Sequence, residues 1–286
     1  MKIILCIFML LVSSAFGNIY YVSPDGDDSW DGSKDFPWRT IQHAVNSIEP
    51  EPPERDNIFV AEGYYEEDLV LKDYINVYGG FHKATWDPHI QWYPTFISPP
   101  SGALIQLGDD SVFGGFIIHG GLKCSGASPD ILNCRILMSS YHGIECVNGA
   151  SPRIIGCSIR QCPGNGIDIH LNSSPEIRET VIAQNWGSGV IIYSSDCSPV
   201  LDHVTVADNL GAGVYLDPSK NEVTIDNSII WSNNDDLVNC HASHSCVSDG
   251  DDYPGVVDSD PLFFGWGGYN ENQPLYAAPW GGITGS

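Results

Sequence analysis

Four stretches of 22 residues decide the fold: GASPDILNCRILMSSYHGIECV at 126–147, GASPRIIGCSIRQCPGNGIDIH at 149–170, NSSPEIRETVIAQNWGSGVIIY at 172–193 and DCSPVLDHVTVADNLGAGVYLD at 196–217. Each contains a Ser-Pro pair near its start and a glycine that opens its second half. The Ser-Pro pairs begin at Ser128, Ser151, Ser174 and Ser198, and the glycines are Gly143, Gly166, Gly189 and Gly213. Both series step by 23, 23 and 24 residues. A fixed period of this length is the signature of a repeat architecture.

Each repeat consists of short runs of β-branched residues, separated by Gly, Asn, Ser or Pro. Such runs are too short for helices and are typical of strands joined by tight turns. One repeat cannot bury its apolar side alone, whereas stacked repeats share a continuous core. The leucine pattern of leucine-rich repeats is absent, and the period is wrong for propeller blades. We therefore expect an all-β chain, a right-handed parallel β-helix (solenoid) with an N-terminal capping helix.

The ends of the chain fit a solenoid, whose terminal coil needs a cover. In WRTIQHAVNSI at 38–48, the apolar residues Ile41, Ala44, Val45 and Ile48 follow helical spacing, and Thr40 is a candidate N-cap. We divide the chain into a signal peptide (1–17), an N-terminal segment with the capping helix (18–57), first coils with an aromatic-rich insertion (58–120), regular repeats (121–240) and a C-terminal closing segment (241–286).

The segments YYVSPDGDDSWDGSKDFPWRTIQHAV and DNIFVAEGYYEEDLVL, together with NSIIWSNN and SCVSDGDDYPGVVDSDPLFF near the other end, carry a family likeness. The chain resembles secreted bacterial right-handed β-helix repeat proteins of the pectin-lyase-like superfamily over nearly its whole mature length. The resemblance implies the fold. It leaves the activity open, because that superfamily includes lyases, hydrolases, epimerases, adhesins and inert stalks.

Charge and the N-terminal residues limit the partners and the location. The formal net charge is -24, which disfavours nucleic acid and anionic membranes, and also polyanionic sugars unless a cation bridges them. Lys2, an apolar run from Ile3 to Val12 and small residues up to Gly17 predict a signal peptide, hence a protein that is secreted or at the cell surface, without membrane insertion. We expect a monomer.

Removal of the signal peptide leaves eight cysteines, an even number that allows disulfides in an exported protein. Cys240 and Cys246 are spaced to close a short loop. Cys134 and Cys157 are expected to stack in the core as small hydrophobic residues.

Alternation assigns the side chains of the strand that follows each repeat glycine to two faces. Inward positions are Ile144, Cys146, Ile167, Ile169, Val190, Ile192, Val214 and Leu216. Outward residues form two columns, Lys123–Glu145–Asp168–Ile191–Tyr215 and Ser125–Val147–His170–Tyr193–Asp217, with neighbours ~4.8 Å apart.

These columns are the candidate site. Glu145, Asp168, His170 and Tyr193 are its candidate catalytic residues, because they combine paired carboxylates with groups able to act as acid and base. Lys123, Tyr215 and Asp217 are candidate substrate-binding residues. A polysaccharide or cell-surface glycan would be the partner, and a lyase, an epimerase or a glycoside hydrolase the enzyme class. Two alternatives remain: these groups only solvate an outer face, and the protein is a non-catalytic adhesion or structural module.

No cofactor is evident from the sequence, and calcium is the one candidate. The loop DGDDSWDG provides Asp25, Asp27, Asp28 and Asp31 as oxygen ligands, but it lacks the residue order of an EF-hand and its distal Glu. Glu145 with Asp168 is a second candidate for weak calcium binding. A simple polar turn is the alternative for the loop.

Overall fold

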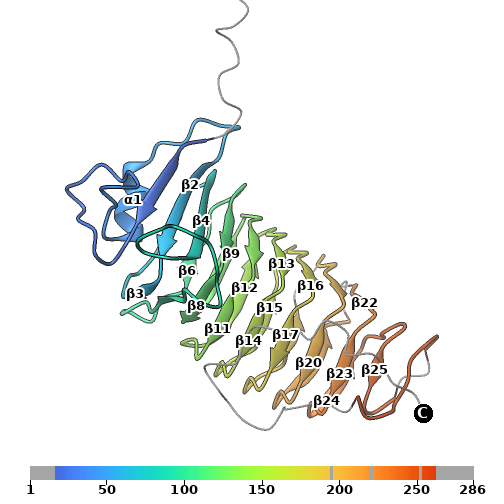
Figure 1. Ribbon diagram of the computed structural model, residues 1–286. Helices are drawn as coiled ribbons and strands as arrows, with labels where there is room; N and C mark the ends of the chain where they lie inside the picture. The colour runs from blue at the N-terminus through green and yellow to red at the C-terminus, as the bar shows by residue number, and fades with distance from the viewer. Residues whose placement is uncertain (1–16, 194–195, 219–221, 251–252, 262–286) are drawn as a thin grey trace, which may run out of the picture.

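The computed structural model describes residues 17–193, 196–218, 222–250 and 253–261. These residues form a parallel β-helix of about eight turns, in which three sheets run side by side along one axis (Figure 1). The predicted signal peptide, apart from Gly17, and most of the closing segment lie outside the described residues. No helix in the described part is long and apolar enough to cross a bilayer.

Sheet A has nine strands and begins at the N-terminal end of the β-helix. Its strands are β1 (Ile19–Val22), β2 (Asp56–Ala61), β4 (Ile75–Phe81), β7 (Val112–Gly114), β10 (Asp130–Leu132), β13 (Arg153–Ile155), β16 (Glu176–Arg178), β19 (Val200–Asp202) and β22 (Thr224–Asp226). All neighbouring strands in it are parallel.

Sheet B also has nine strands, and each of them except β25 follows a strand of sheet A in the same coil. They are β3 (Gly63–Tyr65), β5 (Thr95–Ile97), β8 (Phe116–His119), β11 (Arg135–Leu137), β14 (Ser158–Arg160), β17 (Val181–Ala183), β20 (Thr205–Ala207), β23 (Ile229–Trp231) and β25 (Cys246–Val247).

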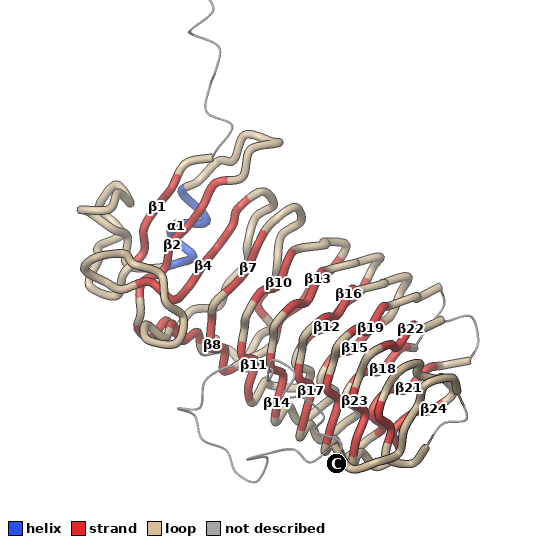
Figure 2. Tube along the Cα trace, turned by 45° about the vertical axis from the view of Figure 1, so that its right-hand side comes forward, coloured by secondary structure: helices blue, strands red, loops and turns tan. Residues whose placement is uncertain are grey.

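Sheet C has seven strands and contains the outward columns predicted from the repeats. Its strands are β6 (Ile105–Gln106), β9 (Leu122–Ser125), β12 (Ile144–Val147), β15 (Ile167–Ile169), β18 (Val190–Ile192), β21 (Ala212–Leu216) and β24 (Asp235–Val238). Figure 2 shows the three sheets as successive sides of each coil.

A single residue makes the corner between sheets A and B in each regular coil. It adopts positive φ, with 52° at Asn133, 66° at Gly156, 49° at Glu179, 56° at His203 and 50° at Asn227. One left-handed residue between two strands redirects the chain without a loop. The coils therefore keep a constant outline and stack in register.

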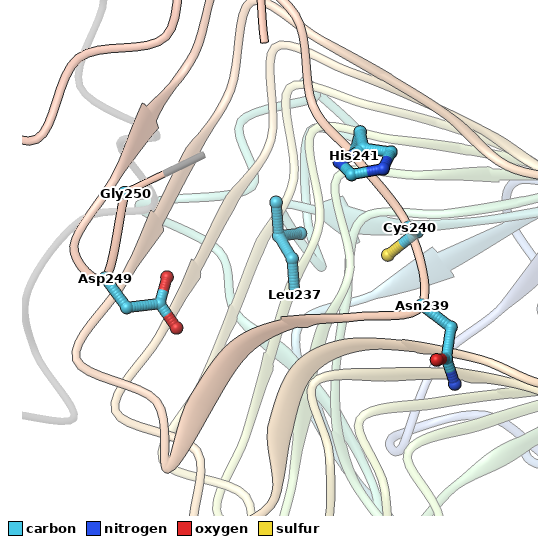
Figure 3. A pocket seen from close by; sticks show the side chains of 6 residues that line it. All are labelled: Leu237, Asn239, Cys240, His241, Asp249 and Gly250. Atoms are coloured by element: carbon cyan, nitrogen blue, oxygen red, sulfur yellow. The ribbon is translucent and has the colours of Figure 1, made fainter. Parts of the chain in front are cut away.

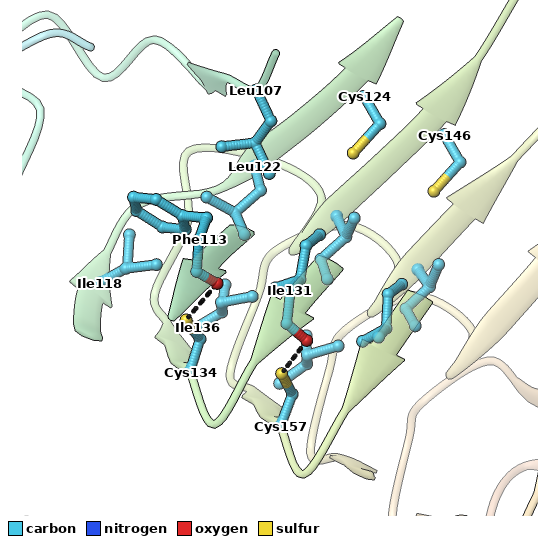
Figure 4. Packing of buried hydrophobic residues seen from close by; sticks show 14 of the residues in the cluster. Leu107, Phe113, Ile118, Leu122, Cys124, Ile131, Cys134, Ile136, Cys146 and Cys157 are labelled. Atoms are coloured by element: carbon cyan, nitrogen blue, oxygen red, sulfur yellow. Dashed lines mark hydrogen bonds between the residues drawn. The ribbon is translucent and has the colours of Figure 1, made fainter. Parts of the chain in front are cut away.

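The inward positions predicted from the repeats are confirmed. Ile144, Ile167, Val190 and Val214 are all 0% exposed and occupy the same register position in successive strands of sheet C. Figure 4 shows part of this core, with Cys134 and Cys157 donating weak hydrogen bonds to the carbonyl oxygens of Phe113 and Ile131. Cys134 and Cys157 are buried, as expected for small hydrophobic residues in the core.

Polar side chains also stack inside the solenoid, at the turn between sheets B and C. The amide of Asn185 donates to Asn209, and the amide of Asn209 donates to Asn233, both at 2.9 Å. Asn185 and Asn209 are almost fully buried, so this ladder satisfies groups that water cannot reach.

The capping helix α1 (Ile41–Ser47) covers the first coil. Thr40 is its N-cap and accepts a hydrogen bond from the backbone N–H of His43. The carboxylate of Glu67 accepts from the N–H groups of Ile41 and Gln42, which are unpaired at a helix start. Ile41, Ala44 and Val45 are buried, so the predicted cap is confirmed.

Two sequence-based expectations need correction. Val147 belongs to an outward column, yet it is only 3% exposed. It lies between Ser125 and His170 in register, and Asn148 bonds to Ser125 beside it, so its neighbours cover it. Cys240 and Cys246 do not close a loop by a disulfide, since both are present as thiols.

Candidate functional site

The strand register of sheet C places the first outward column as predicted. Glu145 on β12 pairs with Lys123 on β9 and with Asp168 on β15, and the column continues through Ile191 on β18 to Tyr215 on β21. His170 and Tyr193 extend the second column, since their N–H groups donate to Cys146 and Ile169 of the preceding coil. Residues from five successive coils thus lie on one outer face.

Glu145 lies between Lys123 and His170 on this face and contacts both side chains. Its Oε1 lies 3.0 Å from Nζ of Lys123 and 3.8 Å from Nε2 of His170. All three side chains are partly exposed. Lys123 is therefore held by a carboxylate of its own column, and the charge of Glu145 is largely offset.

Asp168 has a different environment from the one the sequence indicated. It was expected to point into solvent, but the residue is only 1% exposed. One carboxylate oxygen, Oδ2, accepts a hydrogen bond of 3.0 Å from the amide of Asn165 and lies 3.4 Å from Nε2 of His142. The other, Oδ1, has no hydrogen-bond partner and lies 3.6 Å from Nε2 of His170. A buried carboxylate is thus flanked by two imidazole rings.

The tautomer of His142 follows from its neighbours. Its Nδ1 lies 3.0 Å from the backbone N–H of Asn165 and must accept that hydrogen bond. A neutral imidazole that accepts at Nδ1 carries its proton on Nε2, which faces Asp168. Burial lowers the pKa of His142, against the opposing effect of the Asp168 charge. His142 is therefore neutral, with its Nε2–H facing the Asp168 carboxylate.

Tyr193 forms the aromatic side of the site. Its ring stacks on the His170 ring with centroids 4.9 Å apart and planes inclined by 12°. Burial, followed by the negative charge of Asp168, raises the pKa of Tyr193 to about 12. The phenol is therefore protonated at neutral pH, and its hydroxyl lies close enough to Asp168 to hydrogen-bond with it.

Five of the seven residues predicted to act on a substrate come together: Lys123, Glu145, Asp168, His170 and Tyr193. Tyr215 and Asp217 lie on the same face but further along the axis, because Ile191 separates Tyr215 from Asp168 in the column. His142 and Asn165 were missed. Both occupy the position before a repeat glycine, and that shared position was the available signal.

The predicted calcium loop shows separate structural roles for its four carboxylates. Asp28 accepts hydrogen bonds from the N–H groups of Arg39 and Thr40, and Asp25 pairs with Lys83 at 3.0 Å. Asp27 and Asp31 each accept from the N–H two residues further on. In the described chain, no set of three or more His, Cys, Asp or Glu side chains is arranged to hold a metal ion. Calcium binding at the loop stays a prediction, as does calcium binding at Glu145 with Asp168.

Two pockets lie away from the candidate site. One of about 310 Å³ is at the C-terminal end of the solenoid and is lined by Leu237, Asn239, Cys240, His241, Asp249 and Gly250 (Figure 3). The other, of about 520 Å³, lies over the first strands of sheet A, against Phe59, Tyr78 and Phe81. None of the residues of the candidate site on sheet C lines either of these two pockets.

The arrangement has the parts of an acid–base centre. His170 is partly exposed and can exchange a proton with a ligand, while the carboxylates of Asp168 and Glu145 face its Nε2. Tyr193 adds a protonated hydroxyl and a ring face. Asp168 is too deeply buried to contact a ligand and is a positioning residue for the two imidazoles.

Comparison with known proteins agrees with this architecture. A family model described as "Right handed beta helix region" matches residues 111–252. Together with the three parallel sheets, this match shows that the chain has the right-handed parallel β-helix fold. No curated protein matches the sequence.

Solved structures with a similar fold include the XylC complex with xylose and the pectate lyase Pel9A. The XylC structure has a TM-score of 0.56 and 12% identity, and the match covers 80% of this chain and 65% of that one. The Pel9A structure has a TM-score of 0.47 and 15% identity, covering 81% of this chain and 63% of that one. The chain thus spans less than two thirds of either length. At this identity the likeness concerns the fold alone.

Proposed function

We propose that the outer face of sheet C binds a polysaccharide and performs acid–base chemistry on it at His170. The observation that carries this proposal is the convergence of His170, Glu145 and Tyr193 over the buried carboxylate of Asp168. These residues come from three coils: Glu145 and Asp168 belong to the first outward column, and His170 and Tyr193 belong to the second.

Each residue has a distinct role in this proposal. His170 exchanges the proton with the sugar, and Asp168 orients its ring from beneath. Glu145 is the second carboxylate of the site and, unlike Asp168, it is partly exposed. Tyr193 donates a hydrogen bond to the sugar, and its ring packs against the apolar face of the sugar. Tyr215 and Asp217 would contact sugar units further along the chain, and Lys123 would contact them on the other side.

The direction of the columns supports a polymeric ligand. Successive outward residues are spaced by one coil, about 4.8 Å, which is close to the length of one sugar unit in an extended glycan. A chain laid along the solenoid axis would meet equivalent positions of β9, β12, β15, β18 and β21 in turn. The similarly folded XylC, solved with xylose, provides support of a general kind.

The other functional class is a non-catalytic surface or adhesion module. The position of the site outside the two pockets favours it, as do the short turns around sheet C. Both readings agree with export to the extracellular space or the cell surface, which the N-terminal 17 residues predict.

The test is a glycan-binding and degradation screen of residues 18–286, followed by substitution. We expect His170→Ala and Tyr193→Phe to abolish product formation, while the far-ultraviolet circular dichroism is unchanged. His203→Ala is the matched control, because His203 also pairs with an aspartate, at 2.7 Å, but follows a strand of sheet A. Binding without any product would favour the surface module. Equal activity of all three variants would contradict the proposed site.

A further inference from the structure

The charge balance of the site is the feature that points beyond a generic glycan. Along the two outward columns between Lys123 and Asp217 there are one amine and three carboxylates, those of Glu145, Asp168 and Asp217, so the formal charge is +1 - 3 = -2 with the histidines neutral. Lys123 is engaged with Glu145 at 3.0 Å. No other Lys or Arg occurs in these columns, all of whose members are described.

Asp168 is the deeply buried carboxylate of these columns. Its side chain is 2% exposed, and Oδ1 lacks a hydrogen-bond partner. Oδ2 accepts a hydrogen bond from the neutral amide of Asn165 and lies 3.4 Å from Nε2 of His142, whose tautomer is set by the backbone N–H of Asn165. Because a buried charge is weakly screened, its potential extends to the surface at His170 and Glu145.

We infer that this face selects a glycan of protonated amino sugars, in preference to a neutral glycan and against a polyuronate; the inference rests on the function proposed above. A protonated amine placed between His170 and Glu145 would offset the charge of Asp168. A uronate carboxylate in the same place would add a third negative group with no free cation nearby. The ring of Tyr193, which stacks on His170, and the ring of Tyr141, whose centroid lies 4.1 Å from that of the His142 ring, are both exposed and provide the apolar walls of the site.

The net charge of the whole protein also favours a polycationic glycan over a polyanionic one. The net charge of -24 attracts a polycationic chain from a distance and repels a polyanionic one. Long-range attraction alone would not depend on which carboxylate is present. The local inference therefore requires a variant that distinguishes the site from the overall charge.

The experiment measures binding of three β-1,4-linked or α-1,4-linked tetramers by calorimetry at low salt: glucosamine, N-acetylglucosamine and galacturonate. We expect the glucosamine tetramer to bind at least tenfold more tightly than the N-acetylglucosamine tetramer, and the galacturonate tetramer to bind at least tenfold more weakly than the neutral one. The advantage of the amine should shrink in 0.5 M salt (roughly half the Debye length of 0.1 M).

Asp168→Asn should reduce the ratio of amine to neutral affinity at least fivefold. Glu179→Gln makes the same change of net charge at an exposed site between β16 and β17 and should leave the ratio within twofold of wild type. Thermal unfolding of both variants checks that each is folded.

The outcomes separate this inference from the proposed function. Equal or tighter binding of galacturonate, or an amine preference that Asp168→Asn and Glu179→Gln reduce equally, would overturn the inference. If the neutral tetramer bound as well as the amine and His170→Ala abolished both, the site would stand and only the ligand class would fall. Binding of no tetramer would overturn both.

Discussion

Replacing Ile167 by alanine tests whether the stacked interior of sheet C stabilises the solenoid as its register implies. Ile167 is 0% exposed and lies in register between Ile144 and Val190 of the adjacent coils. The substitution removes three carbon atoms, worth about 2.4 kcal/mol at ~0.8 kcal/mol per buried methylene. Close packing prevents the neighbours from filling the space, and the cavity raises the expected loss to roughly 3–5 kcal/mol.

Ile191→Ala is the matched control, since it makes the same chemical change one coil away on the opposite face of the sheet. Ile191 is partly exposed and lies between Asp168 and Tyr215 in the outward column. With little cavity formed, we expect a loss of about 1 kcal/mol.

Urea unfolding followed by circular dichroism measures both losses as shifts of the midpoint. Solenoids are held by contacts between neighbouring coils, so Ile167→Ala is also expected to lower the slope of the transition if terminal coils unfold separately. Equal losses for Ile167→Ala and Ile191→Ala, or a larger loss for Ile191→Ala, would refute the assignment of faces.

Three further outcomes follow from individual contacts. Val147→Asp should cost several kcal/mol in urea unfolding, because Val147 is buried and an unpaired charge there has no partner; a loss below 1 kcal/mol would contradict its burial. For His142 the folded pKa lies below the unfolded value of about 6.5, so the unfolded chain binds more protons and stability falls as the pH drops through 6.5. His142→Gln should reduce that fall between pH 7.5 and 5.5, and an unchanged slope would argue against it. Ultraviolet titration of wild type against Tyr193→Phe should show the phenol of Tyr193 ionising near pH 12, and a difference signal that rises at pH 10 would contradict the raised pKa.

The repeat in the sequence is sufficient to predict the architecture because each coil obeys the same local chemistry. Spacing of 23 or 24 residues fixes which side chains stack, and alternation fixes which face they occupy. The spacing between repeats and the alternation of side chains along a strand can both be read directly from the sequence. The predicted pairs Glu145 with Asp168 and His170 with Tyr193 are accordingly neighbours in the structure.

Exposure could not be predicted in the same way. Val147 and Asp168 are both in outward columns, yet their neighbours cover them almost completely. Whether an outward residue reaches water depends on side chains at the turns, such as His142 and Asn165, whose direction has no period of 2. The sequence thus indicated the position of Asp168 but not its role as a buried positioning group.

The close corner before each strand of sheet C explains why the turn residues reach the site. A Cβ on Gly143 would lie 2.6 Å from the carbonyl oxygen of Gly166, and one on Gly166 would lie 2.6 Å from that of Gly189. Only glycine permits this approach of adjacent coils, because real Cβ atoms do not come so near to backbone oxygen. The residue before each glycine is therefore held against the sheet, where His142 and Asn165 both contact Asp168. The repeated glycine that marks the fold in the sequence is thus also the reason that a carboxylate on the outer face is enclosed, oriented and left without a cation of its own.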